Sequence, residues 1–150
     1  MERSIDGKHQ QNLQGLLHTT SEFQINGLLL HLAESFSLLA RVKGLRRPDT
    51  VFLNDGVYGG LADLRDMTLP DRVRVFCPAG SGRRGTPRPR VIFGPTCDSL
   101  DRLPDGLPLP DDTAVGDYVL FDAMGAYSIA MSTAFNGYGL RDVTSVQSLR

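Results

Sequence analysis

The 150-residue chain is long enough for one domain with a single hydrophobic core, and too short for a complete α/β-barrel enzyme of about 250 residues. Its 16 basic and 17 acidic residues give a net charge of −1 at pH 7, so no overall field favours nucleic acid or an anionic membrane as the main partner. The 16 glycines and 9 prolines favour short strands joined by turns over a bundle of helices.

Neither a membrane span nor a disulfide framework is expected. The longest apolar run, residues 27–30, is far shorter than the roughly 18 to 20 apolar residues that a spanning helix needs. The first 14 residues are polar and contain no apolar core of a signal peptide. The two cysteines, Cys77 and Cys97, are expected to be free thiols in a reducing compartment, which by default is the cytoplasm.

Residues 1–31 form a divergent leader, and its polar part, residues 1–26, is expected to be poorly ordered or an isolated helix, because the apolar content there is low. Residues 32–150 are expected to form the folded domain. Alternation of apolar and polar residues from Phe36 to Val42 predicts a strand, although residues 33–35 would fit a helix equally well. Residues 46–49, Arg-Arg-Pro-Asp, are typical of a turn.

Five further segments have the composition of short strands, and turn residues separate them. We expect them at residues 51–53, 73–76, 91–93, 117–121 and 127–134. Two intervening segments are expected to be exposed loops. Residues 78–90 are rich in glycine, proline and arginine, and residues 103–112 are rich in proline and acidic residues. Short strands at this spacing predict a mainly β fold, either a barrel or a sandwich.

The clearest chemical signal is the segment Gly-Pro-Thr-Cys-Asp-Ser-Leu-Asp, residues 94–101. The fixed φ of Pro95 forces a turn after a predicted strand, and Cys97 and Asp98 follow on the exit of that turn. A thiol in such a loop can donate or accept a proton. The alternative interpretation is a half-buried cysteine beside an aspartate that caps the turn, and the pattern alone leaves both open.

Two other groups of residues carry weaker signals. Four arginines (Arg83, Arg84, Arg88 and Arg90) could bind phosphate or nucleic acid, but without interleaved aromatic residues a solvated, mobile loop is favoured. The three histidines (His9, His18 and His31) lack the spacing of a metal site, so no metal is expected.

Segment 94–101, together with Phe-Leu-Asn-Asp-Gly-Val-Tyr-Gly at 52–59, resembles the C-terminal region of eukaryotic-type ornithine decarboxylases. Residues 116–121, 124–127 and 135–137 are similar to that family's next blocks, in the same order. The family belongs with the pyridoxal-phosphate-dependent decarboxylases of ornithine, diaminopimelate and arginine. The resemblance covers about residues 32–150 and implies a C-terminal β-barrel or sandwich domain without the family's α/β barrel.

The resemblance also implies roles for single residues. Cys97 matches the catalytic cysteine that returns a proton to the substrate α-carbon after carbon dioxide leaves. Asp98 matches the aspartate that binds the distal ammonium of the substrate, and an aspartate rather than a glutamate there favours ornithine over diaminopimelate. Asp66 is matched to a second substrate-binding aspartate, with a spacing one residue short.

Three aromatic residues complete the set of residues carried over from the family. Tyr127 matches a tyrosine that contacts the phosphate of pyridoxal 5′-phosphate. Tyr58 and Phe135 match residues at the dimer interface, where each active site combines the β-domain of one subunit with the barrel of the other.

The lysine that would bind the cofactor covalently has no match, since the chain contains only Lys8 and Lys43 and no Gly-Gly-Gly run. We therefore expect a domain or split subunit of an ornithine decarboxylase. The complete enzyme would convert ornithine to putrescine and carbon dioxide for polyamine synthesis, whereas this chain would be inactive alone. Lysine or another basic amino acid is the alternative substrate. The alternative function is a non-catalytic interaction module, or a gene remnant, that pairs with a full-length homologue. The expected partners are a second copy or a barrel-containing homologue and an amino acid substrate, with neither nucleic acid nor membrane.

Overall fold

A computed structural model describes residues 36–47, 49–65, 72–104, 106–125, 127–139 and 143–145. The predicted leader at residues 1–31 lies outside the described residues. The strands are β1 (Leu38–Arg46), β2 (Thr50–Leu53), β3 (Val73–Phe76), β4 (Pro87–Phe93), β5 (Leu107–Pro110) and β6 (Tyr118–Phe121). The helical segments are the 3-10 helices η1 (Ala62–Arg65) and η2 (Phe135–Gly137) and the single-turn helix α3 (Tyr127–Ala130). No helix among the described residues is long and apolar enough to cross a membrane.

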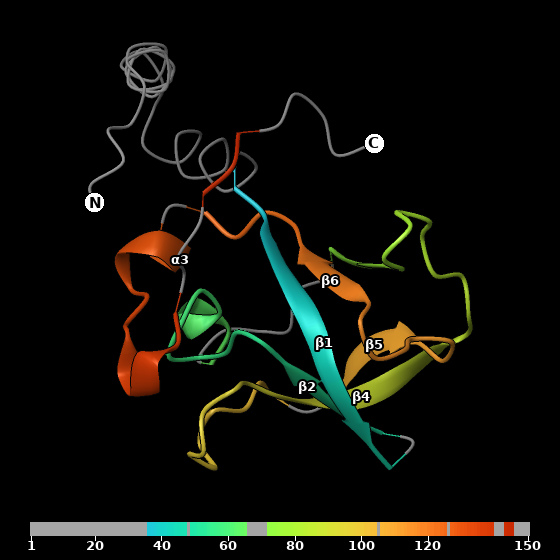
Figure 1. Ribbon diagram of the computed structural model, residues 1–150, viewed down its shortest axis with the longest axis horizontal. Helices are drawn as coiled ribbons and strands as arrows, with labels where there is room; N and C mark the ends of the chain where they lie inside the picture. Colours follow the sequence, from blue (N-terminus) through green and yellow to red (C-terminus); the bar gives the residue numbers. More distant parts are fainter. Residues whose placement is uncertain are drawn as a thin grey trace.

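The six strands form one sheet in the order β3-β6-β1-β2-β4-β5, with β1 as its long central strand (Figure 1). The first half of β1 pairs with β6 and the second half with β2, both antiparallel, while β2 pairs with β4 in parallel. The pairing of β1 with β2 shifts at Lys43, where one extra residue forms a bulge. The two edge strands, β3 and β5, also contact each other, so the sheet curls into a nearly closed barrel. The predicted mainly β fold is confirmed.

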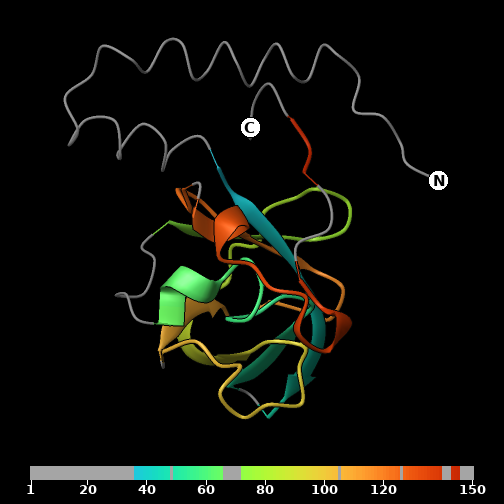
Figure 2. The same cartoon turned by 90° about the vertical axis from the view of Figure 1, so that its left-hand side faces the viewer.

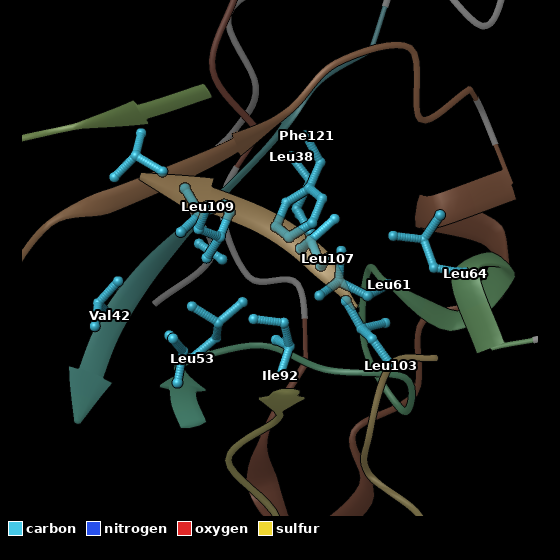
Figure 3. Packing of buried hydrophobic residues seen from close by; sticks show 14 of the residues in the cluster. Leu38, Val42, Leu53, Leu61, Leu64, Ile92, Leu103, Leu107, Leu109 and Phe121 are labelled. Atoms are coloured by element: carbon cyan, nitrogen blue, oxygen red, sulfur yellow. The ribbon is translucent and has the colours of Figure 1, made fainter. Parts of the chain in front are cut away.

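The core fills the inside of this curled sheet. In β1, Leu38, Ala40 and Val42 are buried and the residues between them are exposed, as the alternating sequence predicts. Side chains from all six strands and from the loops around η1 make up this core, and Figure 3 shows most of them converging on the same interior. The largest fully buried side chain is Phe121, at the end of β6.

The structure corrects both loop predictions. Strand β4 begins at Pro87, inside the predicted loop 78–90, and β5 lies inside the predicted loop 103–112. In the register of these two antiparallel strands, Pro87 faces Pro110 and Pro89 faces Pro108. Only alternate residues of an antiparallel strand point their N–H groups at the partner strand. Prolines that face each other can occupy the other positions, so that the residues between them make the hydrogen bonds of the sheet.

The predicted strand at residues 127–134 is also wrong. The chain forms α3 there and then continues without regular structure to Ala134. A strand needs a free sheet edge, whereas β6 is paired on both sides and the edge strands β3 and β5 contact each other. Gly125, with φ of 67°, turns the chain away from the sheet before α3 begins.

The solvated loop that the sequence favours for the four arginines between residues 83 and 90 is found only in part: Arg84 is exposed in the loop before β4, whereas Arg88 and Arg90 lie in β4. The guanidinium of Arg83 donates to both carboxylate oxygens of the fully buried Asp117, from Nε at 2.8 Å and from Nη2 at 2.9 Å. Arg90 is buried in β4, and Arg88 is paired with Asp111 at 3.4 Å. Arg83 and Arg90 therefore pack into the barrel, while Arg84 and Arg88 remain exposed.

Candidate active site

The loop that follows β4, residues 94–101, presents Cys97 and Asp98 side by side. Cys97 is exposed and Asp98 is half-buried. The backbone N–H of Leu100 donates to Oδ1 of Asp98 at 2.9 Å, so the predicted capping of the turn by this aspartate is confirmed. The half-buried cysteine of the same interpretation is wrong, because the thiol faces the outside.

A buried carboxylate, Asp101, fixes this loop to a second loop. Its Oδ2 accepts hydrogen bonds from Thr96, from the backbone N–H at 3.0 Å and from the hydroxyl at 2.8 Å. Its Oδ1 accepts one from the backbone N–H of Val57 at 2.9 Å. Gly56 and Gly94 allow this approach, since a Cβ atom at either position would overlap the carboxylate. Asp101 therefore sets the position of the Cys97 loop relative to the loop that carries Tyr58.

The second loop, residues 54–60, is organised by another buried carboxylate. Asp55 accepts hydrogen bonds from the backbone N–H groups of Gly56 at 2.8 Å and of Gly60 at 3.1 Å. A Cβ on Gly59 would overlap the Asp55 carboxylate. Burial raises the pKa of Asp55, and the backbone hydrogen bonds offset part of that rise.

The raised pKa of Asp55 predicts a pH-dependent stability. The folded chain holds this proton more tightly than the unfolded chain, so the resulting stabilisation is complete below about pH 3.9 and is lost as the pH rises through the raised pKa. Asp55→Asn cannot ionise. The free energy of unfolding of the wild type minus that of Asp55→Asn is therefore expected to fall as pH rises from about 3 to about 7. Urea unfolding at a series of pH values measures this difference, and a rise with pH would contradict the assignment.

Tyr58 links the two loops through the carboxylate of Asp98. Its hydroxyl donates a hydrogen bond to Oδ2 of Asp98 at 2.5 Å. This bond, with the one from the Leu100 N–H, lowers the pKa of Asp98 below its usual value, and the same bond raises the pKa of Tyr58. Asp98 is thus an anion at neutral pH, with the charge that an alkyl ammonium group would pair with.

A third segment, residues 133–136, lies over both loops. The N–H and hydroxyl of Thr133 both donate to the carbonyl oxygen of Tyr58, at 2.9 and 2.7 Å. The ring of Phe135 packs on the ring of Tyr58, with centroids 4.6 Å apart. The side-chain amide of Asn136 donates to Sγ of Cys97 at 3.7 Å. The segment follows α3, which contacts η1 beside the loops (Figures 1 and 2).

The structure therefore brings together four of the six residues that the sequence analysis selected: Cys97, Asp98, Tyr58 and Phe135. Asp66 lies outside the described residues, and Tyr127 begins α3 but its side chain is not described. Three residues that support the site, Asp55, Asp101 and Asn136, were not predicted from the sequence. The only signal for them was their place inside the blocks 52–59, 94–101 and 135–137.

These loops do not fit covalent binding of pyridoxal phosphate. They offer a thiol, carboxylates, a phenol and an amide, whereas the aldehyde of this cofactor needs an amine. The one lysine among the described residues, Lys43, is exposed in the bulge of β1 and is on neither loop.

Sequence comparisons identify relatives over most of the chain. Residues 17–125 match the family model described as pyridoxal-dependent decarboxylase, C-terminal sheet domain. The ornithine decarboxylase of Schizosaccharomyces pombe is 36% identical over 117 residues, which cover 71% of this chain and 27% of that protein. Antizyme inhibitor 2 of Xenopus laevis is 40% identical over 88 residues, 58% of this chain and 18% of that protein. The chain thus spans less than a third of the length of these relatives.

Solved structures give the same result. The lysine/ornithine decarboxylase of Vibrio vulnificus complexed with cadaverine superposes with a TM-score of 0.58 and 29% identity, over 73% of this chain and 31% of that one. The arginine decarboxylase of Paramecium bursaria Chlorella virus gives a TM-score of 0.59 and 28% identity, over 71% and 29%. By sequence and by fold, the chain belongs to the pyridoxal-dependent decarboxylases and contains their C-terminal sheet domain.

Proposed function

We propose that this domain supplies a proton-donating thiol and an ammonium-binding carboxylate to the active site of an ornithine decarboxylase, which forms putrescine and carbon dioxide. The observation that supports the proposal most is the adjacency of Cys97 and Asp98 on one turn, held by the buried Asp101. Pyridoxal phosphate would be held by a part of the enzyme other than these loops, on the same chain or on a partner.

In this proposal the two side chains act on opposite ends of the substrate. Asp98, kept ionised by Tyr58, binds the distal ammonium of ornithine. Cys97 donates the proton of its thiol to the carbon that has lost carbon dioxide, so an S–H bond breaks and a C–H bond forms. The thiolate then regains a proton from water.

The preference for ornithine rests on the relatives. The ornithine decarboxylase of S. pombe is among the similar proteins, and the V. vulnificus enzyme, named for lysine and ornithine, has been solved with cadaverine and with putrescine. Both ligands are diamines that end in the kind of ammonium group that Asp98 can bind. Lysine is the second substrate that this carboxylate suits.

The proposal is tested by mixing the 150-residue chain with a full-length homologous ornithine decarboxylase whose own catalytic cysteine is replaced by alanine. We expect the wild-type chain to restore putrescine formation from ornithine, and Cys97→Ala to abolish that rescue. Cys77→Ala is the matched control, since this half-buried cysteine lies after β3 and is expected to leave the rescue intact. Equal rescue by the Cys97→Ala chain would contradict the role of the thiol.

The Asp98→Ala chain separates binding from proton transfer in the same assay. Loss of a hydrogen bond to a charged group costs about 1.5–3 kcal/mol, which predicts a rise in KM for ornithine of roughly 10- to 150-fold. The value of kcat is expected to change less, because Cys97 remains in place.

A second function is favoured by one of the relatives. Antizyme inhibitor 2 of X. laevis is named for regulation and not for decarboxylation, yet it matches this domain at 40% identity. An interaction module would bind the full-length homologue and change its activity whether or not Cys97 is present. Binding with equal effects of the wild-type and Cys97→Ala chains would support this second function.

A further inference from the structure

Asn136 contacts the thiol of Cys97 from a part of the chain nearly forty residues away. Its Nδ2 lies 3.7 Å from Sγ of Cys97, a hydrogen-bond distance for sulfur, with the amide as donor. Both side chains are exposed, so neither is held there by burial. What holds the amide in place is therefore the backbone of η2 and the contacts on either side of it.

The backbone at Asn136 is in the left-handed region, with φ of 52° and ψ of 22°. Asparagine adopts this region more readily than most other residues with a side chain. Two turn hydrogen bonds fix the conformation: Gly137 N–H to Ala134 O at 2.9 Å, and Tyr138 N–H to Phe135 O at 3.1 Å. The segment just before Asn136 is bound to Tyr58 through Thr133 and the ring of Phe135, so the turn is attached to the same loops as the site.

We propose that Asn136 is a positioning residue for Cys97: its amide N–H occupies one lone pair of the sulfur and so directs the S–H proton away from η2. The same N–H stabilises the negative charge that is left on sulfur once the proton has moved. The consequence for decarboxylation rests on the function proposed above, whereas the effect on the thiol itself does not.

A different explanation for Asn136 makes the opposite prediction. If asparagine is present only because the backbone is left-handed, glycine should replace it without loss, since glycine populates this region most easily. If the amide acts on sulfur, glycine preserves the turn but removes the amide that donates to Sγ of Cys97, and the reactivity of the thiol should change. Asn136→Gly is for this reason the decisive variant, and Asn136→Asp, similar in size, keeps the side chain but replaces the donor with a carboxylate.

The experiment measures alkylation of the two cysteines of the folded 150-residue chain by iodoacetamide at pH 8. Trypsin releases Cys77 and Cys97 in separate peptides, residues 75–83 and 91–102, so Cys77 is an internal reference in every sample. Thermal unfolding followed by circular dichroism checks that each variant is folded.

We expect the rate of alkylation of Cys97 relative to Cys77 to fall about three- to tenfold in Asn136→Gly, because the thiolate is the nucleophile and loses its donor. Asn136→Asp is expected to be slower still, because a carboxylate beside the sulfur opposes the thiolate. An unchanged or increased ratio in Asn136→Gly would overturn the proposal.

The rescue assay adds a second readout. Asn136→Gly is expected to lower kcat for putrescine formation with KM for ornithine unchanged, whereas a displaced turn would disturb Tyr58 and change KM as well. A change in KM with a normal alkylation ratio would overturn the proposal. If the Cys97→Ala chain also rescues, the proposed function fails, but the alkylation order of the Asn136 variants still decides whether the amide acts on sulfur.

Discussion

Asp101→Ala is expected to lower the free energy of unfolding by about 3 kcal/mol. The substitution removes three hydrogen bonds and leaves the N–H groups of Val57 and Thr96 without their acceptors beside a new cavity. Urea unfolding followed by circular dichroism measures the change, which suits a chain without tryptophan.

The control for this carboxylate is Asp63→Ala in η1, where the aspartate is half-exposed. Its effect is expected to stay within about 0.5 kcal/mol, as for most surface substitutions. The Asp101→Ala chain should also fail to rescue the cysteine-less homologue at protein concentrations where the wild type rescues, because the Cys97 loop loses its fixed position. A loss of stability below about 1 kcal/mol would show that Asp101 does not organise the two loops.

Phe121→Ala is expected to destabilise the domain by about 3–5 kcal/mol. Phe121 is fully buried and lies beside Leu38 of β1 and Leu107 of β5 in the core (Figure 3). Truncation to alanine leaves a cavity that strands paired on both sides cannot easily close. The midpoint of urea unfolding, with the slope unchanged, reports this loss.

A matched substitution on the other face of the same sheet is Leu39→Ala. Leu39 lies on β1, which pairs with β6, and is 54% exposed. Its removal is expected to cost less than about 1 kcal/mol, because most of the side chain is already in water. Similar effects of the two variants would contradict the assignment of the core to the inside of the curled sheet.

Local patterns in the sequence were sufficient to predict the strands that are built from apolar residues. The alternation from Phe36 to Val42 predicts the inward face of β1, because successive side chains of a strand point to opposite sides. Short runs such as Val73–Phe76 predict β3 for the same reason. The exposed turn with Cys97 and Asp98 was also predictable, since Gly94 and Pro95 follow directly on the apolar run 91–93 and favour a turn there.

The elements built from prolines were not predictable from the residues nearby. Proline is a turn signal on its own, and only the register with β5, which places proline opposite proline, makes β4 longer than its apolar run. The apolar residues after Tyr127 suit a strand, yet no free sheet edge is left for them and they form α3. Both outcomes depend on which strands are neighbours in space.

The chemistry of the site divides in the same way. The sequence by itself determined which reactive groups the domain carries and that Cys97 and Asp98 are neighbours, because adjacency along the chain needs no fold. Only the tertiary structure decided what surrounds them: Tyr58 on the Asp98 carboxylate, the bond from Val57 to Asp101 that joins the two loops, and Asn136 on the sulfur. These contacts join residues that are distant in sequence, and a hydrogen bond between such residues exists only after the barrel has closed and brought their loops together.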